Sequence, residues 1–83
     1  MKLHEALRLT TEDGAWIAVV PHGKDGRAAR QAMRWDKQAK AWAVAFWFGD
    51  GPWKIADMAL ETMPVRLGER AIDSEWEVVE VPR

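Results

Sequence analysis

The chain has 83 residues and a formal net charge of −1, from 12 lysines and arginines against 13 aspartates and glutamates. This length makes one domain, residues 1–83, and the balanced charge argues against direct binding to nucleic acid. The absence of cysteine excludes disulfides and thiolate metal sites and suits a reducing cytoplasm. No apolar run is long enough to cross a membrane.

The first expected element is a short helix over residues 3–9, because Leu3, Ala6 and Leu7 form one apolar stripe. Gly14 is the turn residue that follows it. Residues 16–20 are rich in β-branched and aromatic side chains, which predicts a strand. The helix is too short to be stable alone, so we expect it to dock its leucines on a sheet.

A hairpin is expected in the middle of the chain. Residues 29–35 alternate in polarity, which favours a strand, although several good helix formers make a helix the alternative. A polar loop over residues 36–40 then leads to a strand over residues 41–48. One face of that strand is large and apolar and is the expected core. The other is small except for Trp47, so it permits the close approach of a helix, a ligand or a second chain.

The C-terminal half begins with the strongest turn signal in the chain, at residues 49–52. A short strand is expected over residues 53–55. A helical turn is expected over residues 57–63, with Asp57 as its N-cap and Pro64 as its terminator. Another turn of helix over residues 68–73 precedes a final strand over residues 76–81. Together these elements predict an α+β fold, in which the N-terminal helix packs on a four- to five-stranded, mostly antiparallel sheet.

The sequence offers little for catalysis or metal binding. The two histidines, His4 and His22, fall on separate elements, and Ser74, the only serine, lies in no nucleophile elbow. Glu75 and Glu77 share one face of an expected strand but lack an evident apolar pocket. We therefore expect no enzymatic activity, no cofactor and no metal ion.

Six tryptophans are more than a core of this size readily encloses, since each indole offers roughly 200 Å² and an N–H group that needs a partner. We expect some of them at a surface that a ligand or a second subunit covers. Charge is also uneven, with a basic stretch over residues 24–40 and an acidic one over residues 57–80. This pattern is typical of a solvated surface or of a self-complementary interface.

A ligand-binding site is the functional interpretation that these residues favour. Arg30 and Arg34 project from one face of an expected strand, and a guanidinium pairs well with phosphate oxygens. Trp47 and Trp53 offer indoles on which a purine can stack. Asp73, in the acidic closing segment, completes the candidate set. The alternative is that both arginines face solvent and that the tryptophans pack at a subunit interface.

The two ends of the chain resemble one family. His4-Glu5-Ala6-Leu7 followed by Gly14 is similar to the opening of the second Thoeris anti-defence family of small phage proteins. The closing stretch over residues 71–80, which reads Ala-Ile-Asp-Ser-Glu-Trp-Glu-Val-Val-Glu, resembles that family's ending. The resemblance implies a dimer or tetramer in the cytoplasm of a bacterial host. Such an oligomer sequesters a cyclic nucleotide-type immune signal without cleaving it.

The leading hypothesis is therefore a non-enzymatic phage or prophage anti-defence protein that binds and sequesters a nucleotide-type signal as a homo-oligomer. Two alternatives stay open. One is a protein-interaction inhibitor of a host defence complex, comparable to an anti-CRISPR protein. The other is a small phage structural protein.

Overall fold

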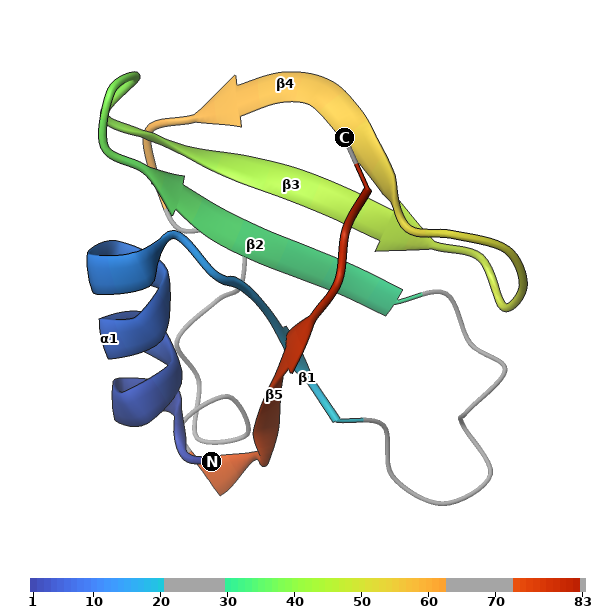
Figure 1. Cartoon of the computed structure of the whole chain (residues 1–83), viewed down its shortest axis with the longest axis horizontal. Coiled ribbons are helices and arrows are strands. Elements are labelled where there is room, and N and C mark those ends of the chain that lie inside the picture. Colours follow the sequence, from blue (N-terminus) through green and yellow to red (C-terminus); the bar gives the residue numbers. More distant parts are fainter. Residues whose placement is uncertain (21–29, 63–72, 83) are drawn as a thin grey trace.

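The computed structural model describes residues 1–20, 30–62 and 73–82, and this part of the chain forms one helix and one sheet (Figure 1). The elements are, in chain order, α1 (Leu3–Asp13), β1 (Trp16–Val19), β2 (Arg30–Asp36), β3 (Ala41–Trp47), β4 (Lys54–Leu60) and β5 (Trp76–Val79). The strand order is β4-β3-β2-β1-β5, and each neighbouring pair is antiparallel. The predicted α+β fold with a helix on an antiparallel sheet is confirmed.

Helix α1 extends one turn beyond the predicted residues 3–9 and ends at Gly14. This glycine adopts a left-handed conformation with φ of 71°, and its N–H donates to the carbonyl oxygen of Thr10 at 3.1 Å. Left-handed backbone after a helix favours glycine because other residues carry a Cβ penalty there. The turn directs the chain from the helix straight into β1.

One face of the sheet, which we call the helix face, packs against α1. Ile17, Met33 and Val44 are fully buried and stand in register on β1, β2 and β3. Leu3 and Ala6 of the helix pack in the same cluster as Ile17 and Met33. The large apolar face predicted for residues 41–48 therefore packs into the core at Val44.

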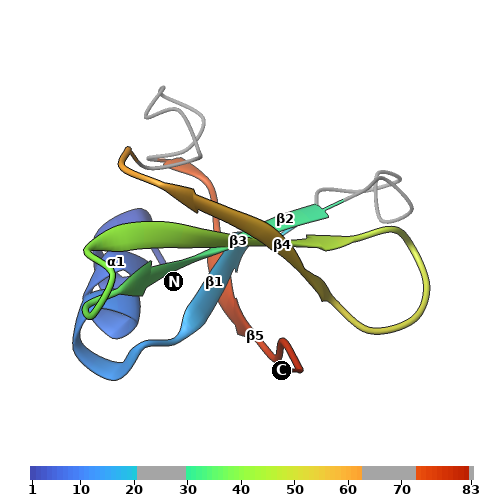
Figure 2. The ribbon, with the colours of Figure 1, turned by 90° about the horizontal axis from the view of Figure 1, so that it is seen from above.

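The opposite face, which we call the alanine face, has Ala18, Ala32 and Ala45 in register at its centre, and all three are buried. The chain covers these alanines with its own side chains, Trp16, Trp53, Val79 and Val81. The small side chains of this face were expected to let a helix, a ligand or a second chain approach closely, and here side chains of the same chain occupy that position. The sheet is strongly twisted, so that β5 runs steeply across the direction of β3 and β4 (Figures 1 and 2).

The N-terminal residue is tied to β5. The Met1 amino group donates to the carbonyl oxygen of Trp76 at 3.0 Å, and the Trp76 N–H donates to the Met1 carbonyl oxygen at 2.7 Å. The same amino group forms an ion pair with Glu75 at 2.9 Å. Its hydrogen bond and positive charge, with a smaller contribution from Lys2, lower the pKa of the Glu75 carboxyl.

Part of the C-terminal half differs from the prediction. Asp57 does not cap a helical turn, because residues 54–60 form β4, which also extends well beyond the strand predicted over residues 53–55. The local signals of Asp57 and Pro64 are outweighed by pairing with β3, where Ala43 opposes Ala59. The helix alternative for residues 29–35 is likewise wrong over the described residues 30–35, which belong to β2. The helical turn predicted over residues 68–73 lies, except for Asp73, outside the described residues.

The side chain of Thr10 joins the last turn of the helix to β2. Thr10 is fully buried, and its Oγ1 accepts from the Trp35 N–H at 3.0 Å. We predict that Thr10→Val, which keeps the shape but removes the acceptor, lowers the free energy of unfolding by about 1–3 kcal/mol. Urea unfolding curves measure this loss.

The matched control is Thr11→Val. The Thr11 hydroxyl donates only to helix carbonyl groups, those of Leu7 at 2.8 Å and Arg8 at 3.2 Å. Its removal leaves no N–H unsatisfied, so the free energy of unfolding changes by less than about 0.5 kcal/mol. Equal effects of the two substitutions would show that the bond to Trp35 does not anchor the helix.

Candidate ligand-binding site

Arg30 and Arg34 both stand on the alanine face of β2, as predicted, but they lie in different surroundings. Arg30 is opposite Trp47 of β3, and Arg34 is opposite Ala43. Four residues along a strand span roughly 13 Å. The buried Ala32 lies between the two arginines. They therefore do not form one twin-guanidinium site.

Arg30 is enclosed by its own chain. Its Nη2 donates to the carbonyl oxygen of Val19 at 3.0 Å and to Oε1 of Glu77 at 2.5 Å. The guanidinium carbon lies 5.4 Å from the centre of the Trp53 ring, which is cation–π distance. Only 17% of the Arg30 side chain is exposed. Arg30 thus connects β1, β2, β5 and the turn before β4, and little of it faces a ligand.

Trp47 and Trp53 stabilise the turn that joins β3 to β4. Their ring centres are 6.4 Å apart, and the Trp47 indole N–H donates to the Gly51 carbonyl oxygen at 2.9 Å. Gly49 and Gly51 adopt positive φ values of 98° and 72°, as the turn predicted over residues 49–52 requires. The structure therefore brings Arg30, Trp47 and Trp53 together as one cluster.

Arg34 lies at the C-terminal end of α1. Its Nε donates to the Gly14 carbonyl oxygen at 2.8 Å, which fixes the guanidinium plane. A Cβ atom at Gly14 would lie 3.3 Å from Nη2 of Arg34, so the glycine also makes room for this side chain. Neither Nη atom of Arg34 has a hydrogen-bond partner among the described residues. Arg34 thus retains donors for another molecule. Arg30 differs because its side chain is enclosed, and its buried Nε has no hydrogen-bond partner among the described residues.

Two surface depressions meet at Arg34. The first, of about 410 Å³, combines this guanidinium with apolar walls and is here called the Arg34 depression; it is lined by Asp13, Gly14, Trp16, Arg34, Ile55 and Val81. The second, of about 500 Å³, is polar and lies between the end of α1 and the β2–β3 turn. Lys37 lines it and donates to the Glu12 carbonyl oxygen at 3.3 Å. Arg34 and Lys37 line this second depression together with the acidic residues Glu12, Asp13 and Asp36.

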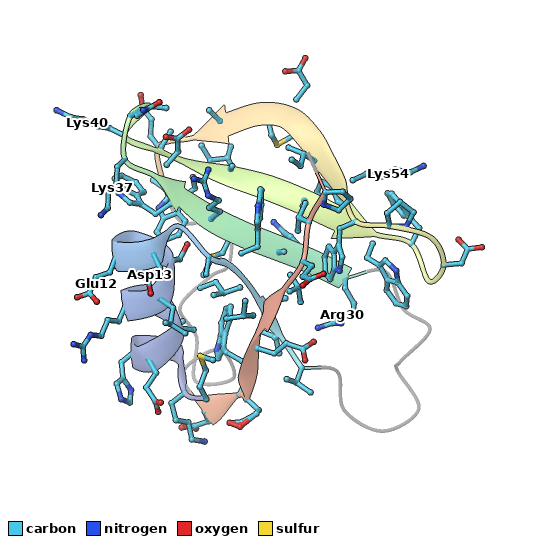
Figure 3. The ribbon with its side chains drawn as sticks, viewed as in Figure 1. Glu12, Asp13, Arg30, Lys37, Lys40 and Lys54 are labelled. Atoms are coloured by element: carbon cyan, nitrogen blue, oxygen red, sulfur yellow. The ribbon has the colours of Figure 1, made fainter. Side chains whose placement is uncertain are left out.

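Figure 3 shows the separation of the two regions. Arg30 projects from the end of β2 that is remote from the helix, whereas Lys37 lies at the opposite end, near Glu12 and Asp13 (Figure 3). Asp73 belongs to neither region. It is exposed, and its backbone carbonyl oxygen accepts from Nζ of Lys2 at 3.2 Å.

The predicted surplus of indole surface is distributed unexpectedly. Trp76 is buried and the other five tryptophans are half-buried. The exposed large apolar side chains in the described part of the chain are Phe48, Ile55, Met58 and Val78. No sequence pattern identified Trp16, Ile55 and Val81 as neighbours of Arg34, because they come from strands and a tail that only the pairing register brings together.

Comparisons with family models, curated proteins and solved structures return no match for this chain. Within residues 1–20, 30–62 and 73–82, no three histidine or acidic side chains gather in a group able to hold a metal ion. In the same ranges no helix has the length and apolar character needed to cross a membrane.

The contrast between the two arginines predicts different effects on stability. Arg30→Ala removes two hydrogen bonds and leaves Glu77 unpaired, so we expect the free energy of unfolding to fall by roughly 1.5–3 kcal/mol. Arg34→Ala removes one bond to a neutral carbonyl and costs about 0.5–1.5 kcal/mol. Chemical denaturation of both variants measures the difference. Equal losses, or a larger loss for Arg34→Ala, would contradict the assignment of Arg30 as the structural member.

Proposed function

We propose that the protein is a non-enzymatic binding protein for a nucleotide-type anion, which it holds at the Arg34 depression. In keeping with the resemblance of its two ends to the phage anti-defence family, this binding sequesters an immune signalling molecule of the bacterial host. The observation that carries the proposal is the Arg34 guanidinium. It is fixed at Nε by Gly14, its Nη donors have no partner within the described residues, and it lies beside an apolar wall.

The polar part of the argument concerns phosphate recognition. A guanidinium presents its N–H groups in a planar fork that matches two oxygens of a phosphate or carboxylate. Because the Gly14 carbonyl fixes the Arg34 side chain, less conformational entropy is lost when an anion binds. Lys37, in the adjoining polar depression, offers a second positive charge for a ligand that carries more than one phosphate.

The apolar part of the argument concerns the base. Trp16, Ile55 and Val81 line the Arg34 depression beside the guanidinium. Indoles provide stacking surfaces for bases, and aliphatic side chains exclude water from the same contact. The volume of about 410 Å³ falls within the usual range for small-molecule sites. A base on this wall and a phosphate on Arg34 would use both halves of the depression.

The direct experiment is a thermal-shift screen of the wild-type protein against cyclic dinucleotides and cyclic ADP-ribose isomers. A bound ligand at 100 times its Kd adds about 2.7 kcal/mol to the stability and raises Tm. For a ligand that raises Tm, we expect Arg34→Ala to weaken binding roughly 10- to 100-fold in calorimetric titration, because a charge-assisted hydrogen bond is lost.

The control variant is Arg8→Ala. Arg8 is an exposed arginine on α1 that pairs only with Glu12, at 3.3 Å, and lies outside the Arg34 depression. Its replacement should leave Kd unchanged. An unchanged affinity in Arg34→Ala would remove Arg34 from the site, and the absence of a Tm shift with every compound would oppose nucleotide binding.

A second candidate function is inhibition of a host defence complex by direct protein contact. The exposed apolar side chains Phe48 and Met58 favour it, since exposed apolar surface is typical of protein interaction sites. Co-purification of a host complex from infected or expressing cells, combined with no Tm shift in the nucleotide screen, would support this second function over the first.

A further inference from the structure

Asp13 is the acidic residue that the two depressions beside Arg34 share. The residues common to both linings are Asp13, Gly14 and Arg34. The Asp13 carboxylate therefore belongs to the junction of the two depressions, as the guanidinium does. Asp13 is exposed, and it is the last residue of α1. A ligand that uses both depressions has to pass this carboxylate.

The other two carboxylates of the second depression are already engaged. Oε2 of Glu12 accepts from Nε of Arg8 at 3.3 Å. Oδ1 of Asp36 accepts from two backbone N–H groups of the β2–β3 turn, at 3.0 and 3.2 Å. Asp13 has no hydrogen bond and no ion pair in the described part of the chain, not even with Arg34. Its two carboxylate oxygens are thus available to another molecule.

The position of Asp13 opposes the stability of the helix. The carbonyl groups at the C-terminal end of a helix carry a partial negative charge, so an acidic side chain in the last turn is unfavourable. The last turn of α1 contains no basic residue that would offset this charge. A residue that conflicts with a local rule is typical of a functional position. The helix end therefore points to a role for Asp13 outside folding.

The chemistry of a nucleotide assigns a ligand group to this carboxylate. The proposed function places the phosphate on Arg34 and the base on the apolar wall of the Arg34 depression. The ribose joins these two groups, so it comes next to the junction to which Asp13 belongs. Ribose hydroxyl groups are neutral donors, and a carboxylate is a strong acceptor for them. A phosphate is not a partner for Asp13, because the two negative charges repel each other.

We propose that Asp13 accepts a hydrogen bond from a ribose 2′-hydroxyl, so that the site selects ribonucleotides over 2′-deoxyribonucleotides. This inference rests on the proposed function, because it needs a nucleotide whose phosphate lies on Arg34. The 2′-hydroxyl is the group by which a protein distinguishes the two classes. In a cyclic dinucleotide closed through its 3′ and 5′ oxygens, this hydroxyl stays free to donate.

Calorimetric titration with matched cyclic dinucleotides tests the inference. The probes are cyclic di-AMP and cyclic di-GMP, both closed through 3′ and 5′ oxygens, and the 2′-deoxy counterpart of each. We expect the wild-type protein to bind a ribose form roughly 10-fold more tightly than its deoxy counterpart, because the deoxy form lacks the hydrogen bond to a charged acceptor. In Asp13→Ala the two forms should bind with equal affinity. The ratio of the two affinities is the readout, since loss of a negative charge beside Arg34 raises the affinity for both anions.

The matched control is Glu12→Ala. Glu12 precedes Asp13 and lines the second depression but not the Arg34 depression, so this variant should keep the preference for the ribose form. Both substitutions replace an exposed residue at the end of the helix, and Tm without ligand should stay nearly unchanged in each.

Two results overturn the role of Asp13 and leave the proposed function standing, provided that Arg34→Ala still weakens binding. One is equal binding of the two forms by the wild-type protein, and the other is a preference that persists in folded Asp13→Ala. The absence of binding by every probe also overturns the inference. The Tm screen, which includes cyclic ADP-ribose isomers, then decides separately on the proposed function.

Discussion

Three small side chains determine how the alanine face is built. Ala18, Ala32 and Ala45 stand in register on β1, β2 and β3, and each is almost completely buried. Because none extends beyond a methyl group, larger side chains from other parts of the chain lie close against the sheet. The sheet therefore has two covered faces over its central strands, although only one face carries a helix.

The side chains that pack on the three alanines also determine the different roles of Arg30 and Arg34. The side chains above Ala32 separate Arg30 from Arg34, although both leave β2 on the same face. Arg30 is enclosed by Trp53 and Glu77 and ties strands together. Arg34 lies beyond the covered area, where the end of the helix meets the sheet, and keeps its outer donors. The same residue type thus has a structural role at one position and is available for recognition at the other.

The elements near the start and middle of the chain followed from local patterns. Period-two alternation assigned the faces of β2 and β3 correctly, and the glycines at positions 14, 49 and 51 marked backbone with positive φ. Asp57 misled the prediction because a capping residue and a downstream proline are local signals, whereas β4 depends on pairing with β3. Tertiary pairing outweighs such signals when the strand partner is already in place.

The candidate site followed from the sequence only in part. The shared face of Arg30 and Arg34 was predictable, since alternate residues of a strand face one side. Their separate environments were not, because the Gly14 carbonyl that fixes Arg34 is 20 residues away and Glu77 is 47 residues from Arg30. Trp16, Ile55 and Val81 meet through strand register, which no periodicity in a single sequence specifies.

The central claim is that Arg30 has a structural role and that Arg34 binds the ligand. Its most direct test is nuclear magnetic resonance of the arginine side-chain Nε–H groups, assigned by mutation and followed while a nucleotide from the screen is added. The account predicts that the Arg34 signal moves with ligand concentration and that the Arg30 signal stays in place. Movement of the Arg30 signal with a stationary Arg34 signal would contradict it.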